Sequence, residues 1–215
     1  MYTLPNMNET FMTTHDILTH YKGFSPQLLK NLTALLNHGR LKGTGKLLIS
    51  AVDQGFEHGP SRSFASQPEA YDPYYHFKMA VEGGLSAFAA PLGMLEVGHA
   101  AFGSKIPTIL KINSSNALSE SAAPTQAITA SVADAVRLGC IGIGYTLYPG
   151  SADNDHLIEG LQRISYEAKE AGLIVVVWSY PRGNVSKAGE TALDVVAYGA
   201  HMACLLGAHI VKVKI

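Results

Sequence analysis

The sequence predicts an α/β protein with a parallel sheet, of the (β/α)₈ TIM-barrel type but limited to the first six β/α units. From residue 46 onward, short apolar runs rich in β-branched residues alternate with stretches of helical character. Strands that alternate with helices form right-handed βαβ units and hence a parallel sheet. The runs start 22 to 40 residues apart, enough for one strand, one helix and two loops. The six predicted strands are 46–53, 86–91, 108–113, 140–146, 173–180 and 209–215.

The composition is typical of a globular protein of the cytoplasm. Of 215 residues, 47% are hydrophobic and 15% are charged, which supplies a sizeable core and excludes a disordered chain. The net charge of −1 leaves no basic footprint for nucleic acid. The longest strongly apolar run, 173–178, is too short to cross a bilayer, and the polar start lacks a signal peptide. The two cysteines, Cys140 and Cys204, cannot form a disulfide framework and indicate a reducing compartment.

Helix signals lie between the predicted strands. Apolar spacing and end signals predict helices over 125–138, 157–171 and 190–206. Pro124 suits the opening of the first of these helices. Each predicted helix is followed by a glycine, the residue that most often ends one: Gly139, Gly172 and Gly207. Since no linker interrupts the later pattern, we expect a single partial-barrel domain over 46–215, preceded by an N-terminal extension and helix over 1–45.

Two architectures fit this pattern, an open doubly wound sheet and a (β/α)₈ barrel. An open sheet that binds a dinucleotide should carry a G-x-G-x-x-G motif after its first strand, and the sequence contains no such motif. Polar residues near the carboxyl ends of the predicted strands favour the barrel, because barrel enzymes place their active sites there. In the last strand, where side chains alternate between faces, the apolar residues suit the helix side. Lys212 and Lys214 are then expected to point into the lumen.

Two lysines in a lumen permit Schiff-base chemistry. A lysine amine in a site of low dielectric constant, with a second cation nearby, favours its neutral form. A neutral amine forms an imine with a ketone or aldehyde, and the protonated imine draws electrons from the neighbouring C–C or C–H bond. Lys212 and Lys214 supply this arrangement if they face the lumen. The alternative is that both are surface lysines at the edge of the sheet.

Other polar residues at the strand ends suit the same reaction. Tyr180 lies two residues beyond Trp178 on the same strand face and can act as a general acid or base, or fill the core. Arg182 follows in the loop and can bind a phosphate, or remain a solvated charge. Asp53 ends the first strand and can hold a lysine or a substrate hydroxyl, or cap the turn at Gly55.

A metal site is a weaker interpretation of the segment after the first strand. Asp53, Glu57 and His58 offer metal-ligating atoms there. However, no familiar zinc spacing, such as H-E-x-x-H or C-x-x-C, occurs in the sequence. We therefore expect neither a metal nor an organic cofactor.

Five strings in the sequence match family motifs in order. They are DQGFEHGP at 53–60, ILKIN at 109–113, GYTLYPGS at 144–151, WSYPRG at 178–183 and VKVK at 211–214. The first resembles the D-[HQ]-G-x-E-H-G-P signature of class I fructose-bisphosphate aldolases of the archaeal and bacterial (DhnA-like) type, and the last resembles the K-x-K segment of their sixth strand. Gln54 stands where archaeal members usually have His, and we expect no functional change from it. The resemblance covers nearly everything after residue 25.

The resemblance implies a (β/α)₈ barrel and a metal-independent, reversible cleavage of fructose 1,6-bisphosphate to dihydroxyacetone phosphate and glyceraldehyde 3-phosphate. Carried over by motif position, Lys214 would form the Schiff base, Tyr180 would donate and accept the proton, and Asp53 would be an active-site carboxylate. The expected substrate-binding residues are Trp178, Arg182, Lys111 and His58.

The sequence ends inside the expected sixth strand, whereas the resembling family continues with strands seven and eight, whose loops hold a substrate phosphate. We therefore expect an incomplete barrel that is poorly active or inactive by itself. Two alternatives stay open: a related Schiff-base aldolase or transferase for another phosphorylated sugar, and a non-catalytic truncated product. The expected partners are a small sugar phosphate and, because family members are commonly homo-oligomers, further copies of the chain.

Overall fold

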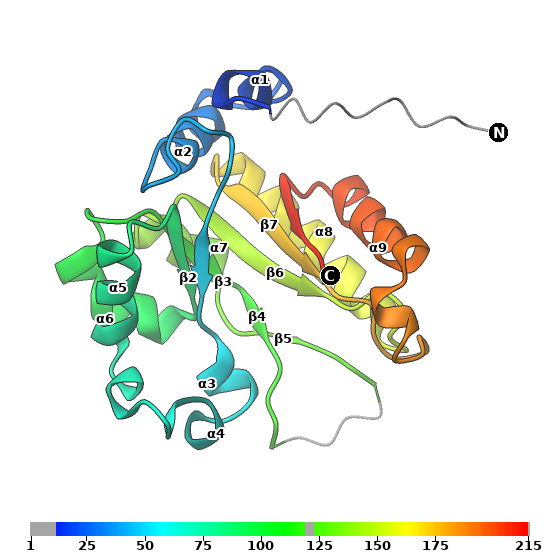
Figure 1. The fold of residues 1–215 in the computed structure, drawn as a ribbon. Coiled ribbons are helices and arrows are strands. Elements are labelled where there is room, and N and C mark those ends of the chain that lie inside the picture. The colour runs from blue at the N-terminus through cyan, green and yellow to red at the C-terminus, as the bar shows by residue number, and fades with distance from the viewer. Residues whose placement is uncertain (1–11, 119–122, 215) are drawn as a thin grey trace.

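Six parallel strands form a curled, open sheet at the centre of the molecule (Figure 1). The structure is a computed structural model and describes residues 12–118 and 123–214. The strand order is β1-β2-β3-β6-β7-β8. In the described part of the chain, β1 and β8 have no outer neighbour, so the sheet is an incomplete barrel, as predicted. The strands are β1 (Ile49–Ala51), β2 (Ala87–Ala90), β3 (Thr108–Lys111), β6 (Gly142–Leu147), β7 (Ile174–Ser179) and β8 (Ile210–Lys212).

Five helices pack on the outer face of this sheet (Figure 1). They are α5 (Pro73–Glu82), α6 (Leu92–Phe102), α7 (Val132–Arg137), α8 (Asn154–Glu170) and α9 (Leu193–Leu205). The strand residues that face these helices include Phe88, Leu110 and Val175, all fully buried. The short helices lie in the N-terminal region and in the loops: α1 (Thr14–Thr19), α3 (Gln54–Glu57), α4 (Pro60–Phe64), η1 (Pro68–Tyr71) and η2 (Gly189–Thr191). No helix in the described ranges is long and apolar enough to cross a membrane.

The inner face of the sheet is covered at one end by helix α2 (Pro26–Leu36). The helix starts cleanly, because the Ser25 side chain accepts a hydrogen bond from the Leu28 N–H. Its apolar side, which includes Leu32 and Leu35, packs with inner-face strand residues such as Ile109. The Asn31 side chain donates to the Gly172 carbonyl, two residues before β7, so α2 lies where the strands begin. The division between 1–45 and 46–215 stays a prediction, and α2 shares one core with the strands.

The structure corrects the helix predicted over 125–138. The helix begins only at Val132, where Ser131 and Asp134 form a capping box. Part of the preceding stretch is extended, because β5 (Ala127–Ile128) pairs antiparallel with β4 (Asn113–Ser114). This pairing joins segments that are far apart in sequence, so local helix signals do not report it.

Residues before α2, for which the sequence showed no pattern, contact the start of the last strand. The Tyr21 hydroxyl donates to the His209 carbonyl over 2.6 Å, and the Phe24 ring lies edge-on to the His209 ring, with 4.8 Å between centroids. His209 Nδ1 accepts from the Val175 N–H at 2.9 Å. Burial, together with the charge of Lys169, lowers the pKa of His209 to about 4.

We expect His209 to make the stability of the fold depend on pH. Its folded pKa of about 4 lies below the ordinary 6.5, so between these values the unfolded chain binds more protons. The free energy of unfolding therefore falls as the pH drops through this window. At about 1.4 kcal/mol for each pH unit of difference, the loss reaches roughly 3 kcal/mol at the lower end. His209→Asn keeps an acceptor for Val175 but does not titrate, so urea unfolding of this variant should depend less on pH. An equal dependence in both proteins would contradict the assignment.

Candidate active site

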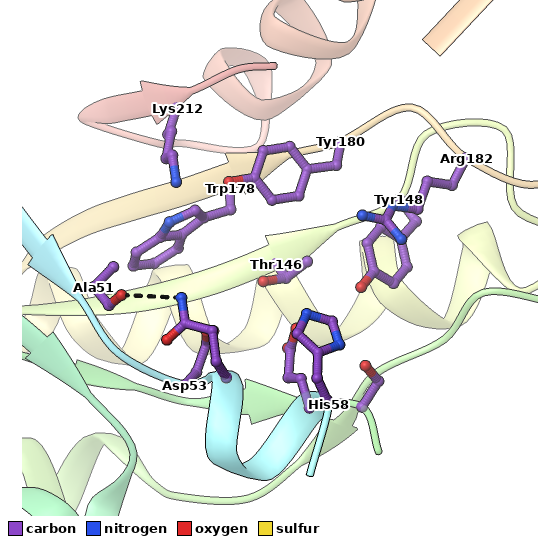
Figure 2. A pocket seen from close by; sticks show the side chains of 12 residues that line it. Ala51, Asp53, His58, Thr146, Tyr148, Trp178, Tyr180, Arg182 and Lys212 are labelled. Atoms are coloured by element: carbon purple, nitrogen blue, oxygen red, sulfur yellow. Dashed lines mark hydrogen bonds between the residues drawn. The ribbon is translucent and has the colours of Figure 1, made fainter. Parts of the chain in front are cut away.

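A pocket of about 210 Å³ opens at the carboxyl ends of the strands (Figure 2). It brings together seven residues that the sequence analysis selected: Asp53, Glu57, His58, Trp178, Tyr180, Arg182 and Lys212. They come from four segments: the loop and helix after β1, the carboxyl end of β7, the loop beyond it, and β8. The convergence follows from the parallel sheet, because the carboxyl ends of all its strands lie on one side.

Lys111 is buried beneath this pocket, and its amine contacts two carboxylates and a backbone carbonyl. The residue is 2% exposed. Its Nζ lies 3.2 Å from Asp53 Oδ2 and 3.3 Å from Glu57 Oε1, and it donates to the Asn113 carbonyl at 2.6 Å. The lysine that Asp53 contacts is therefore Lys111, and the expected roles of both residues toward substrate stay predictions.

Lys212 is the lysine that reaches the pocket. It ends β8 opposite Trp178 of β7, and Figure 2 shows its side chain directed toward the indole. Its Nζ lies 5.6 Å from the centre of the Tyr180 ring. None of the ion pairs within the described ranges involves Lys212. The enclosed surroundings expected for the amine are not found, because β8 is an edge strand and Lys212 is exposed.

The structure corrects the expected position of Lys214. Its Nζ bonds Glu190 Oε2 at 3.0 Å, and it does not line the pocket. The prediction assumed that strand alternation continues to Lys214, but β8 ends at Lys212. Glu190 also pairs with Lys187 at 3.1 Å, and hydrogen bonds from both lysines, first Lys214, lower the pKa of this carboxyl.

Trp178 forms a wall of the pocket and is only 7% exposed. The neighbouring strand makes room for its indole at Gly144, where a Cβ atom would lie 2.1 Å from the Trp178 ring. Any side chain at this position would therefore displace the indole.

Arg182 and Tyr148 lie together at the other side of the pocket from Lys212 (Figure 2). The Arg182 guanidinium stacks over the Tyr148 ring, 5.3 Å from its centre. The Arg182 N–H donates to the Pro149 carbonyl at 3.0 Å, which fixes the loop after β7 against the loop after β6. Burial, followed by the charge of Glu57, raises the pKa of Tyr148.

Several residues of the site were missed as functional residues. Tyr148 and Thr146 line the pocket, and Gln126 contacts Glu57 and Tyr148 beside it. The quoted string at 144–151 contains both pocket residues, so the signal was present without a role attached to it. The Asn113 side chain holds β6 in place. Its Nδ2 donates to the Thr146 carbonyl at 2.9 Å, and its Oδ1 accepts from the Thr146 N–H at 2.7 Å. Glu57 was considered only as a metal ligand, and the described residues contain no cluster of three or more groups suited to hold a metal ion.

We expect the Lys111→Met substitution to destabilise the fold strongly. It leaves the Asp53 and Glu57 carboxylates beside an apolar side chain, which should lower the free energy of unfolding by about 3 kcal/mol in urea titrations. The triple variant Lys111→Met, Asp53→Asn, Glu57→Gln should recover much of this loss, because no uncompensated charge is left. Lys30→Met, at an exposed position of α2, is the matched control. Equal stability of the two single variants would contradict the importance of the cluster.

Comparisons with known proteins agree with this fold and pocket. Residues 47–215 match the family described as DeoC/LacD family aldolase. The chain is 36% identical over 193 residues to a probable class 1 fructose-bisphosphate aldolase of Chlamydia muridarum, covering 88% of this chain and 55% of the relative. It is 36% identical over 184 residues to a fructose-bisphosphate aldolase/6-deoxy-5-ketofructose 1-phosphate synthase of Methanocaldococcus jannaschii, covering 80% and 58%.

A solved structure of a Schiff-base-forming fructose-1,6-bisphosphate aldolase, studied in its reaction intermediates, superposes with a TM-score of 0.75. It is 35% identical, and the match covers 84% of this chain and 69% of that one. The chain thus spans little more than half the length of the two curated relatives. The matched region includes every strand of the sheet and the whole pocket. The chain belongs to the DeoC/LacD family of aldolases.

Proposed function

We propose that this chain carries a class I fructose-bisphosphate aldolase site, which cleaves fructose 1,6-bisphosphate reversibly through a Schiff base and without a metal. One observation carries the proposal: a lysine amine without a carboxylate partner among the described residues shares a pocket with a phenol and a guanidinium. These groups are Lys212, Tyr180 and Arg182. The names of the relatives support fructose bisphosphate as the substrate.

Lys212 is the nucleophile in this proposal, in place of the Lys214 of the sequence prediction. Its amine attacks the C2 carbonyl of the open-chain sugar, and loss of water from the adduct gives a protonated imine. The imine then accepts the electron pair of the C3–C4 bond. Lys214 does not suit this step, because its amine bonds Glu190 away from the pocket.

Tyr180 moves the protons that accompany bond cleavage. It accepts the proton of the C4 hydroxyl while the C3–C4 bond breaks, so that glyceraldehyde 3-phosphate leaves and an enamine stays on Lys212. A proton returned to C3 and hydrolysis of the imine then release dihydroxyacetone phosphate and restore the amine. Figure 2 shows the Tyr180 hydroxyl directed toward Trp178, on the side of the pocket where Lys212 lies.

The remaining groups of the pocket position the substrate. Asp53 lines the pocket while paired with Lys111, so its carboxylate has a fixed orientation toward substrate hydroxyls. His58 is a further polar contact, and Trp178 forms the apolar wall. Arg182 offers a cationic group for a phosphate at the side of the pocket opposite Lys212.

A second candidate is a Schiff-base aldolase or transferase that acts on another phosphorylated sugar. It is favoured by the Methanocaldococcus relative, whose name joins the aldolase to a 6-deoxy-5-ketofructose 1-phosphate synthase. The same nucleophile would serve both reactions.

We place this activity in glycolysis or gluconeogenesis in the cytoplasm, in a homo-oligomer whose ligand is a sugar phosphate. The class of substrate supports the pathway, and the low cysteine content supports the compartment. The resemblance to aldolases supports the oligomer. Gel filtration of the purified chain tests the last point.

Reduction with borohydride in the presence of fructose 1,6-bisphosphate should link substrate carbon covalently to Lys212. The adduct, measured by the mass of the intact chain and of its peptides, should be absent in Lys212→Met and present in Lys214→Met. The reverse pattern would restore the sequence assignment to Lys214. The absence of an adduct on a chain that unfolds cooperatively would contradict the Schiff-base proposal.

Tyr180→Phe should separate imine formation from cleavage. Borohydride trapping should persist, because Lys212 is intact, while the rate of fructose 1,6-bisphosphate cleavage should fall about 10²- to 10⁴-fold, the usual contribution of a general acid or base. Tyr166→Phe, at an exposed position on α8, should leave both measurements unchanged. A cleavage rate in Tyr180→Phe within a factor of two of the parent would contradict the role.

A further inference from the structure

A chain of hydrogen bonds runs from the buried Lys111 to the phenol of Tyr148. Glu57 Oε1 accepts from Lys111 Nζ at 3.3 Å and from Gln126 Nε2 at 3.2 Å. The same Gln126 nitrogen donates to Tyr148 Oη at 2.7 Å. Gln126 is 2% exposed, so both contacts lie in surroundings where a hydrogen bond is strong and an unmade one is costly.

Glu57 decides which way the Gln126 amide points. A carboxylate only accepts hydrogen bonds, so turning the amide over would place the Gln126 oxygen against the oxygen of Glu57. The observed orientation leaves Gln126 Oε1 buried and without a partner in the part of the chain that the structure describes. Because an unmatched buried acceptor is unfavourable, the orientation is imposed by the charge of Glu57.

The orientation of the Gln126 amide determines which acceptors are open to the hydroxyl proton of Tyr148. Since Gln126 donates to Tyr148, the phenol cannot give its own proton to Gln126. The single proton of the phenol can then turn toward the pocket, which Tyr148 and Ser115 both line.

The free O–H lies at a place that suits an anion. Tyr148, Ser115 and Arg182 line both the pocket and an adjoining cleft of about 520 Å³. The Arg182 guanidinium lies over the Tyr148 ring. Because burial and Glu57 raise the pKa of Tyr148, its hydroxyl stays protonated at neutral pH. This end of the site therefore combines a cation with a neutral O–H donor.

We propose that Gln126 is a positioning residue, which holds Tyr148 so that its O–H donates to an anionic oxygen of the ligand beside Arg182. The inference rests on the proposed function in taking the ligand to be a sugar phosphate. Tyr148 and Arg182 lie on the opposite side of the pocket from Lys212 (Figure 2). The oxygen therefore belongs to the half of the sugar that leaves as the aldehyde phosphate.

Equilibrium binding of glyceraldehyde 3-phosphate tests the proposal without turnover. Trp178 is the sole tryptophan and lines the pocket, so its fluorescence reports occupancy. Tyr148→Phe removes the phenol proton and should raise Kd about tenfold, the lower range for a hydrogen bond to a charged group. Unphosphorylated glyceraldehyde should bind with nearly the same Kd to both proteins.

Gln126→Glu tests the positioning role itself. The new carboxylate has the shape of the amide but accepts hydrogen bonds, so the Tyr148 proton turns toward it and away from the ligand. Kd should rise about as much as in Tyr148→Phe, and the double variant should bind no more weakly than Gln126→Glu alone. Tyr145→Phe is the matched control, because the Tyr145 hydroxyl donates to the Leu157 carbonyl and the residue does not line the pocket. Its Kd should not change.

An unchanged Kd in Tyr148→Phe would overturn the proposal. A raised Kd in Tyr148→Phe together with an unchanged Kd in Gln126→Glu would overturn it as well. If Gln126→Glu does not fold, Glu57→Gln serves instead: it lets the Gln126 amide turn over and accept the Tyr148 proton, and it should also raise Kd. Borohydride trapping on Lys212 separates this inference from the function. If binding depends on the phosphate but no borohydride adduct forms on Lys212, the aldolase proposal is wrong. If the adduct forms but Tyr148→Phe leaves Kd unchanged, only the positioning role of Gln126 is wrong.

Discussion

The buried ammonium group of Lys111 fixes the geometry on which the pocket depends. Its Nζ donates to Glu57 and to the Asn113 carbonyl, and it forms an ion pair with Asp53 at 3.2 Å. One atom therefore ties together the end of β1, helix α3 and the start of β4. A buried charge is tolerated only when it is paired and hydrogen-bonded. A shift of any one of these segments would leave a buried charge without its partner, which is energetically costly.

Further hydrogen bonds extend this constraint across the pocket. Glu57 holds Gln126, which holds Tyr148, and the Asn113 side chain braces the backbone of Thr146. The loops that carry Tyr148 and Arg182 are linked in turn by a hydrogen bond from the backbone N–H of Arg182 to the Pro149 carbonyl. The buried ion cluster therefore anchors the loops of the site to the sheet. As a result the strands, and not the loops alone, fix the distances between the groups of the pocket.

The features that the sequence predicted are those that short-range rules determine. Alternation within strands placed Asp53, Trp178 and Tyr180 in one pocket, because the strands continue to these residues or end one or two residues before them. Lys214 was misplaced because β8 ends at Lys212, and the early part of the predicted helix over 125–138 became β5 through pairing with β4. Gln126 lies directly before β5, in a segment without periodicity, so only the tertiary structure reveals that it contacts Glu57.

Burial alone would favour Lys111 over the proposed nucleophile, Lys212. Lys111 is the lysine in the low-dielectric surroundings that the sequence argument required, yet its amine is held by two carboxylates and the Asn113 carbonyl, and it does not line the pocket. Lys214 is engaged by Glu190. Lys212 is exposed, but within the described ranges no carboxylate pairs with it, and its nearest aromatic neighbours are the indole and phenol of the pocket. The proposed reactive amine is therefore distinguished by the absence of a carboxylate partner in the described ranges, because the carboxylates of the pocket, Asp53 and Glu57, are held by Lys111.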